Sequence, residues 1–206
     1  MAKILFLGDS ITHGNDWASK IDFAQVENWA VPGYSTDDVL EQLPHIASAN
    51  HEVISLMIGS NDFGNPALNR SSEETGFNIL KILENLHANN EVSQILIHSI
   101  PPRGSNFSER IRKTNEQIRS FKRERVTYID LWPILAQDDA LNAEFLLQDG
   151  FDVHLNRAGY QAWEDSLLPV LKILSEQNSL PFFQNINIFQ NIYPKLHRSE
   201  EHTSEL

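Results

Sequence analysis

Cysteine is absent from this chain of 206 residues, and positive charge is scarce. The lack of cysteine excludes disulfide bonds, thiolate metal sites and cysteine nucleophiles. The chain carries 16 Lys and Arg against 28 Asp and Glu, which gives a formal net charge of −12 at pH 7. Because an acidic surface repels phosphate backbones and anionic lipid headgroups, this charge disfavours binding to nucleic acid or to a membrane surface.

Long apolar runs are missing as well. No segment reaches the ~18 apolar residues that a membrane-spanning helix needs. The N-terminal apolar run covers only Ile4–Leu7, whereas a signal peptide needs about 7–15 apolar residues before its cleavage site. We therefore expect a cytoplasmic protein. Hydrophobic residues still make up 41% of the chain, which is enough for a folded core and excludes general disorder.

Short apolar segments alternate with amphipathic segments along the chain. The predicted strands are Lys3–Leu7, Ala24–Trp29, Val53–Ile58, Gln94–Ile100 and Val126–Leu131. The predicted helices are Ser35–Leu43, Thr75–Ala88, Ser108–Arg123 and Ala158–Leu174, and the second has an apolar stripe of Phe77, Leu80, Leu83 and Leu86. This alternation predicts an α/β protein with a mainly parallel sheet and helices on both faces.

The end of the chain differs from the rest in composition. A segment with the composition of a linker follows Leu174, so we expect one domain over residues 1–176 and a tail of doubtful origin over residues 177–206. The last nine residues, Arg198–Leu206, read like the translation of a common sequencing-adapter oligonucleotide. We expect an assembly artefact there.

Four polar segments follow predicted strands or strand-like stretches, and that edge of a parallel sheet is where sites are built. They are Gly8–Thr12, Asn28–Gly33, Gly59–Asp62 and Asp149–Asn156. In the first, Ser10 on a turn from strand to helix presents a hydroxyl near helix N–H groups, as a nucleophile requires. In the third, Asn61 offers an uncharged N–H donor that suits a developing oxyanion.

The other two segments add a flexible turn and a base. Gly33 lets a backbone N–H approach a ligand closely. An acid shortly before His154 can fix the tautomer of its ring. Each segment alone also has a purely structural interpretation as a turn, a helix cap or a surface histidine. Their occurrence together, in this order, is what favours catalysis. We expect Asp9 and Asp62, which flank the motifs, to be turn and cap residues that hold the loops.

With these motifs the sequence resembles the SGNH (GDSL-type) hydrolase family of serine esterases over about Lys3–Leu171. The blocks that carry the resemblance are Gly8-Asp9-Ser10, Val31-Pro32-Gly33, Gly59-Ser60-Asn61-Asp62 and His154-Leu155-Asn156. The resemblance implies a flavodoxin-like three-layer α/β/α sandwich. It also implies that Ser10 is the nucleophile and His154 the general base, and that the N–H groups of Ser10 and Gly33 and the side chain of Asn61 form the oxyanion hole.

One position departs from the family pattern. The family usually places its acid three residues before the histidine, and Phe151 stands there in this chain. Asp149-Gly150 looks like the family's usual Asp-Gly followed by two inserted residues. Because positions i and i+2 of an extended segment point to one side, we prefer Asp152 as the partner of His154, with Asp149 as the alternative. A weaker Ser–His pair without an acid stays open.

The resemblance implies a serine esterase that hydrolyses small carboxylic esters or O-acetyl groups, and this chemistry requires no cofactor and no metal. The alternative is a non-catalytic carbohydrate- or ester-binding module on the same fold. A nucleotide-binding domain is disfavoured because no phosphate-binding glycine loop is present. Trp17 and Phe63 follow the motifs and are candidates either for the wall of a substrate pocket or for the core. His13 can line the site, but the role of base fits His154 better.

Overall fold

The computed structural model describes residues 1–177, so the predicted tail lies outside the described residues apart from its first position. A five-stranded sheet in the order β2-β1-β3-β4-β5 runs through the centre, and every neighbouring pair is parallel. The strands are β1 (Lys3–Gly8), β2 (Gln25–Asn28), β3 (Val53–Met57), β4 (Gln94–His98) and β5 (Val126–Ile129). All five predicted strands are therefore confirmed, with small differences at their ends.

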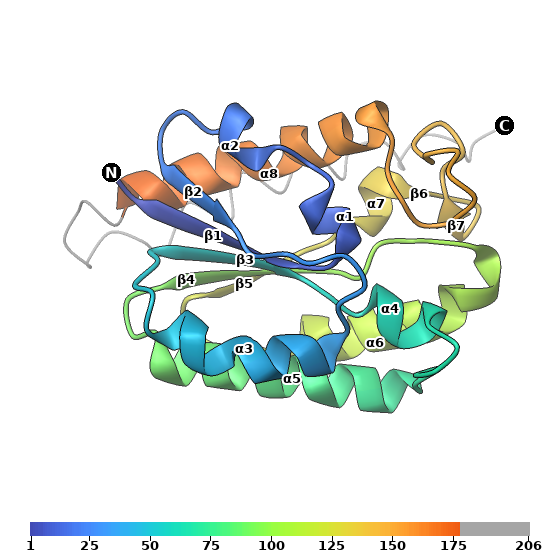
Figure 1. The fold of residues 1–206 in the computed structure, drawn as a ribbon, viewed down its shortest axis with the longest axis horizontal. Helices are drawn as coiled ribbons and strands as arrows, with labels where there is room; N and C mark the ends of the chain where they lie inside the picture. Colours follow the sequence, from blue (N-terminus) through green and yellow to red (C-terminus); the bar gives the residue numbers. More distant parts are fainter. Residues whose placement is uncertain (178–206) are drawn as a thin grey trace, which may run out of the picture.

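Helices cover both faces of this sheet (Figure 1). The helices are α1 (Ser10–His13), α2 (Trp17–Lys20), α3 (Thr36–Ala47), α4 (Ser60–Gly64), α5 (Ser72–Asn89), α6 (Ser108–Ser120), α7 (Trp132–Leu135) and α8 (Arg157–Gln177), with a 3₁₀ turn at Ser105–Phe107. Helices α3, α5 and α6 lie below the sheet in Figure 1, and α8 lies above it with α1, α2 and α7. A small hairpin of β6 (Ala136–Gln137) and β7 (Ala140–Leu141) follows α7. The predicted three-layer architecture is confirmed.

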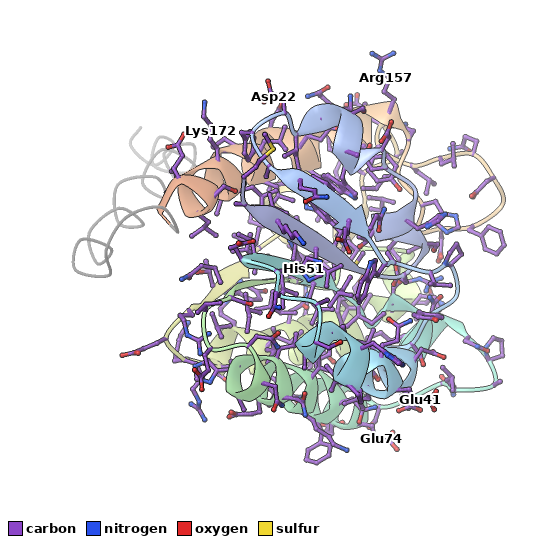
Figure 2. All side chains as sticks on the ribbon, turned by 60° about the vertical axis from the view of Figure 1, so that its left-hand side comes forward. Asp22, Glu41, His51, Glu74, Arg157 and Lys172 are labelled. Atoms are coloured by element: carbon purple, nitrogen blue, oxygen red, sulfur yellow. The ribbon has the colours of Figure 1, made fainter. Side chains whose placement is uncertain are left out.

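Alternating side chains of β1 pack into two separate hydrophobic cores, one on each face of the sheet. Ile4 and Phe6 belong to the core under α8, whereas Leu5 and Leu7 belong to the core against α3, α5 and α6. Because both faces are covered, the central strands read as continuous apolar runs, as is typical of parallel sheets. Figure 2 shows the side chains that fill these cores, with charged side chains such as Glu41 and Lys172 on the outside and the buried His51 inside.

The apolar stripe predicted on α5 is partly wrong. Phe77 is 68% exposed, whereas Leu83 and Leu86 are buried as expected. The buried face of α5 also includes Ile79 and Ile82, so this face is rotated about the helix axis relative to the predicted stripe. Among the described residues, no helix combines the length and apolar character that crossing a membrane requires.

The buried histidine of β4 generates a prediction about stability. His98 is 1% exposed, its Nε2 lies 2.9 Å from Ser55 Oγ, and burial lowers its pKa from 6.5 to about 3. The native state thus holds a neutral imidazole, and the stability that depends on it is lost as the pH falls from about 6.5 towards 3. We expect His98→Gln, which keeps a partner for Ser55, to lose less stability than the wild type between pH 7 and pH 5. Urea unfolding at both pH values checks this, and equal losses would contradict it.

Candidate active site

Parallel strands bring three of the predicted segments to one edge of the sheet. Ser10 begins α1 two residues after the end of β1, and Asn61 lies in the first turn of α4, just beyond β3. Gly33 lies in the loop between β2 and α3. The fourth segment, residues 149–156, leads into the amino terminus of α8, which lies at the same end of the molecule (Figure 1).

Ser10, His154 and Asp149 form a hydrogen-bonded series. Ser10 Oγ lies 2.9 Å from His154 Nε2, although the two residues are 144 positions apart. His154 Nδ1 lies 2.6 Å from Asp149 Oδ2. The pKa of Asp149 is lowered, first by the backbone N–H of Phe151 and then by His154. Because an ionised carboxylate can only accept, Nδ1 carries the proton and Nε2 is free to accept from the Ser10 hydroxyl.

The preference for Asp152 as the partner of His154 is wrong, because another basic group holds that carboxylate. Asp152 Oδ1 accepts from Arg103 Nη2 at 2.6 Å and from Arg103 Nε at 3.2 Å. Asp152 Oδ2 accepts from the backbone N–H of Gly104 at 3.2 Å. Both carboxylate oxygens of Asp152 therefore accept hydrogen bonds from Arg103 and Gly104, in the segment that follows β4, and not from His154.

The local backbone explains why Asp149 reaches His154. The expectation for Asp152 assumed an extended segment, but Gly150 has φ +90°, and Asp149 Oδ1 accepts from Phe151 N at 3.0 Å in a tight turn. The chain thus turns at Gly150 and Phe151, and this turn lets Asp149 reach the ring of His154 five residues later. Glycine permits such a backbone at little cost. At the far end of the loop, Asn156 Oδ1 accepts from the N–H groups of Ala158 and Gly159 and caps α8.

Two of the predicted oxyanion segments are joined by a hydrogen bond. Asn61 Nδ2 donates to the backbone oxygen of Tyr34 at 2.9 Å, which fixes the orientation of the amide. Tyr34 directly follows Gly33, whose φ of +87° favours glycine. A primary amide has two N–H donors, so Asn61 retains one for a ligand.

The two flanking aspartates hold the loops, as expected. Asp9 is fully buried, and its Oδ1 accepts from Ile11 N at 2.9 Å at the start of α1. Asp62 is also fully buried and accepts from the N–H and the hydroxyl of Thr36 and from Arg70 Nη1. Asp62 thus ties α4 to the start of α3, next to the loop that carries Gly33.

Trp17 and Phe63 are not at the surface where a substrate would bind. They are 1% and 2% exposed, and each belongs to one of the two cores. Trp17 stacks on Phe6 with ring centroids 4.5 Å apart and donates to the backbone oxygen of Thr12. The proposed role of these two residues as pocket walls is therefore wrong, and core packing explains them. His13 is exposed, and its Nδ1 lies 3.0 Å from the backbone oxygen of Ala30 instead of near Ser10 Oγ.

The sequence did not single out Arg103 or Leu147, and it gave no role to the side chains of Val31 and Phe151. Arg103 follows Pro101 and Pro102 at the carboxyl end of β4, and this position at the sheet edge is the signal that marks it. Three apolar side chains, Val31, Leu147 and Phe151, are 36%, 43% and 63% exposed. They lie in the loops that carry Gly33 and His154. An apolar rim beside polar groups is typical of a small-molecule site.

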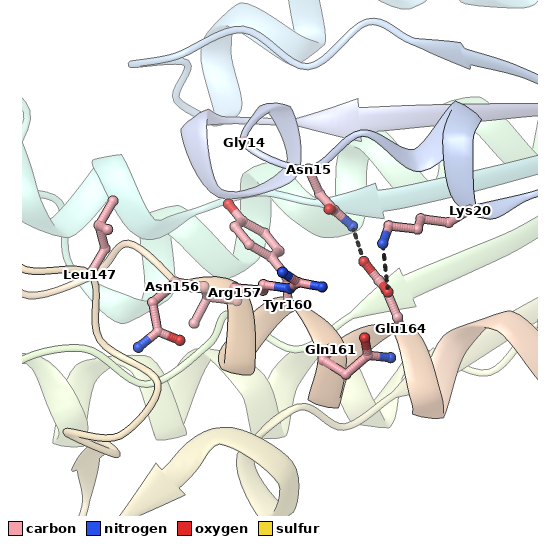
Figure 3. A pocket seen from close by; sticks show the side chains of 10 residues that line it. Gly14, Asn15, Lys20, Leu147, Asn156, Arg157, Tyr160, Gln161 and Glu164 are labelled. Carbon is pink, nitrogen blue, oxygen red and sulfur yellow. Dashed lines mark hydrogen bonds and ion pairs between the residues drawn. The ribbon is translucent and has the colours of Figure 1, made fainter.

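A separate pocket of about 310 Å³ lies between the α1–α2 segment and the start of α8 (Figure 3). Its lining includes Asn156, two residues beyond His154, but not Ser10 or His154. Asn15 Nδ2 and Lys20 Nζ point to the carboxylate of Glu164 at 3.0 and 3.7 Å, so these polar groups satisfy one another. In the described part of the chain, no group of three or more His, Asp or Glu side chains is placed to hold a metal ion.

Comparison with known proteins places this geometry in context. A model of the GDSL-like Lipase/Acylhydrolase family matches residues 6–162. A search of curated protein sequences found none that matches the chain.

Several solved structures share the fold. A GDSL-like lipase from Bacteroides thetaiotaomicron superposes with a TM-score of 0.73 at 16% identity, covering 83% of this chain and 88% of that chain. A carbohydrate esterase family 3 protein from Talaromyces cellulolyticus gives a TM-score of 0.65 at 16% identity, covering 86% and 99%. An acetyl-xylooligosaccharide esterase from Geobacillus stearmophilus gives a TM-score of 0.65 at 17% identity, covering 82% and 93%. At these identities the likeness shows the fold.

The buried carboxyl of Asp9 generates a second prediction about stability. Burial, with a smaller contribution from the charge of Asp62, raises the pKa of Asp9 from 3.8 to about 7. The folded state therefore favours the protonated form, and this contribution to stability is lost as the pH rises from about 4 through about 7. We expect Asp9→Asn, which keeps an acceptor for Ile11 N, to raise Tm relative to the wild type at pH 8 more than at pH 4. The exposed Asp22 provides the control Asp22→Asn. An equal difference in Tm at both pH values would contradict the expectation.

Proposed function

The chain belongs to the GDSL-like lipase/acylhydrolase family, and we propose that it is a serine esterase that hydrolyses small carboxylic esters or O-acetyl groups. The observation that carries this proposal is the series from Ser10 Oγ through His154 to Asp149, with distances of 2.9 and 2.6 Å. A serine that donates to a histidine, which a carboxylate in turn orients, is the arrangement that activates a hydroxyl nucleophile.

In the acylation step, Ser10 Oγ attacks the carbonyl carbon of the ester and its proton passes to His154 Nε2. Asp149 stays ionised and stabilises the imidazolium that forms. The tetrahedral oxyanion accepts hydrogen bonds from the N–H groups of Ser10 and Gly33 and from the second N–H of Asn61. Collapse of this intermediate breaks the bond to the alcohol, which leaves with the proton from His154.

In the deacylation step, His154 takes a proton from water, and the resulting hydroxide attacks the acyl carbon on Ser10. The second tetrahedral intermediate uses the same donors and collapses to release the carboxylic acid, while the proton returns to Ser10 Oγ. Both half-reactions need one histidine whose Nε2 alternates between base and acid. The bond from Nδ1 to Asp149 keeps that ring in the required tautomer throughout.

The surroundings of the site favour a small and neutral substrate. Phe151, whose ring centroid lies 5.4 Å from that of His154, and Val31, in the loop that carries Gly33, are exposed apolar side chains that suit a short acyl group. The net charge of −12 disfavours strongly anionic substrates. The two esterases of similar fold, described as carbohydrate and acetyl-xylooligosaccharide esterases, support the choice of O-acetyl groups on sugars.

The irregular spacing before His154 is the sequence feature that favours the alternative of a non-catalytic binding module. The turn at Gly150 accommodates that spacing and leaves Asp149 bonded to the histidine. A module that only binds an ester has no need for a serine, a base and an orienting acid in series.

The role of Ser10 is open to a direct test. We expect Ser10→Ala to abolish hydrolysis of p-nitrophenyl acetate and to leave Tm almost unchanged, because the hydroxyl contributes little to packing. A fluorophosphonate probe should label the wild-type protein at Ser10, as mapped by mass spectrometry of the adduct. Label on a different serine, or full activity in Ser10→Ala, would contradict the assignment.

The role of Asp149 predicts a large loss that is confined to one aspartate. Asp149→Asn should lower kcat by up to about 10⁴, because an amide can hold the histidine in the wrong tautomer. Asp165 is exposed on α8 and pairs only locally with Gln161, so Asp165→Asn serves as the matched control and should keep wild-type kcat. Steady-state kinetics on p-nitrophenyl acetate decide the matter. A loss below tenfold in Asp149→Asn would mean that Asp149 does not orient the base.

A further inference from the structure

Asp152 binds the loop of residues 149–156 to a buried arginine, Arg103. In the loop of residues 149–156, Gly150 and Phe151 make no side-chain hydrogen bond and Asp149 bonds only within the loop. Among residues 149–152 of the described chain, Asp152 therefore provides the only side-chain hydrogen bonds to a residue outside the loop. Its carboxylate accepts from Arg103 Nη2 and Nε and from Gly104 N.

Arg103 continues this connection into the oxyanion segment. The residue is 8% exposed, and its Nη1 donates to the backbone oxygen of Ser60 at 3.2 Å. Ser60 is the first residue of α4 and directly precedes Asn61. One guanidinium therefore contacts both the loop of the base and the helix of the oxyanion donor.

The surroundings of Arg103 hold its guanidinium in place. Its centre lies 4.3 Å from the ring centroid of Phe107. On another side it packs against Gly64 at the end of α4, where an added Cβ would lie 2.0 Å from Arg103 Nη1. The arginine occupies space that a side chain at Gly64 would need. Because these contacts fix the position of the guanidinium, its ion pair with Asp152 fixes the position of the loop.

The strength of the pair follows from its partial burial. The Arg103 side chain is 9% exposed and that of Asp152 is 43% exposed, so solvent screens the interaction less than at a fully exposed ion pair. Loss of the carboxylate would also leave a buried guanidinium without its anionic partner.

We propose that Asp152 and Arg103 form a positioning pair that keeps His154 and Asp149 aligned with Ser10 and Asn61. The proposal rests on the proposed esterase function and extends it. Neither residue touches the reacting atoms, and both act through the loop of residues 149–156. A shift of the base by about 1 Å can lower the rate by about 10²-fold. An ion pair only two residues from His154 can therefore affect the rate by holding the base in position.

The test compares Asp152→Asn and Asp152→Ala with a matched control. Asp152 is partly exposed, so both variants should fold, and Tm checks this. Glu84 pairs with Arg123 at 2.6 Å, and both side chains are 48% exposed, so Glu84→Gln removes an ion pair remote from the site. We expect fluorophosphonate labelling of Ser10 and kcat to fall by about 10-fold to 100-fold in the Asp152 variants, with KM within about twofold of wild type. Glu84→Gln should match the wild type in every measurement.

The pH profile of the labelling rate separates positioning from a direct charge effect. We expect the plateau to fall in Asp152→Asn while the midpoint, which reports His154, stays at its wild-type pH. A midpoint that moves to lower pH with an unchanged plateau would mean that the charge of Asp152 acts directly on His154, and this would overturn the proposal. A lowered Tm with an unchanged labelling rate would make the pair merely structural and would overturn it as well.

Proton NMR provides a readout that does not depend on catalysis. The Nδ1–H proton of His154 in its short bond to Asp149 should give a far-downfield signal in the wild type and in Glu84→Gln. The signal should be lost or broadened in Asp152→Asn. If the wild type shows no labelling at Ser10, the proposed function fails, and the NMR comparison still decides the positioning role. A signal that persists unchanged in Asp152→Asn would overturn the proposal.

Discussion

The parallel register of β1 and β3 is the constraint on which the site depends. Gly8 is paired with Met57, so the two strands end at the same level. A Cβ at Gly8 would lie 2.3 Å from the backbone oxygen of Met57 and 2.5 Å from Thr12 Oγ1. Only glycine therefore allows β1 to pack this closely against both β3 and the first turn of α1. Ser10 and Ser60 then begin their helices just beyond the carboxyl ends of these two neighbouring strands.

Around this edge, each of three carboxylates that face the site loops has a separate partner. Asp149 is held by His154, Asp152 by Arg103, and Asp62 by Arg70 and Thr36. Because Arg103 holds the carboxylate of Asp152, Asp152 does not compete with Asp149 for the hydrogen bond to His154. Asp9 differs from them, because its second oxygen has no hydrogen-bond partner among residues 1–177 and burial raises its pKa to about 7.

The sequence was sufficient to predict the sheet and the site motifs, because both depend on local patterns. Apolar runs predicted all five strands, and the motifs around Ser10, Asn61 and His154 lie at the predicted edge. The choice of Asp152 failed because it assumed extended backbone, whereas the turn at Gly150 depends on φ +90° and on a local bond that spacing does not reveal. Since Arg103 and Asp152 are 49 residues apart, their ion pair had no local signal either.

We propose that this edge of the sheet is an acyl-transfer site with a preformed oxyanion hole. A crystal structure of the protein after reaction with a small alkyl fluorophosphonate tests it most directly, because the adduct imitates the tetrahedral intermediate. We expect phosphorus bonded to Ser10 Oγ and its free oxygen about 2.7–3.1 Å from the backbone nitrogens of Ser10 and Gly33 and from Asn61 Nδ2. Asp149 should remain on His154 Nδ1. A phosphoryl oxygen that points away from Gly33 and Asn61, or an adduct on another serine, would contradict the account.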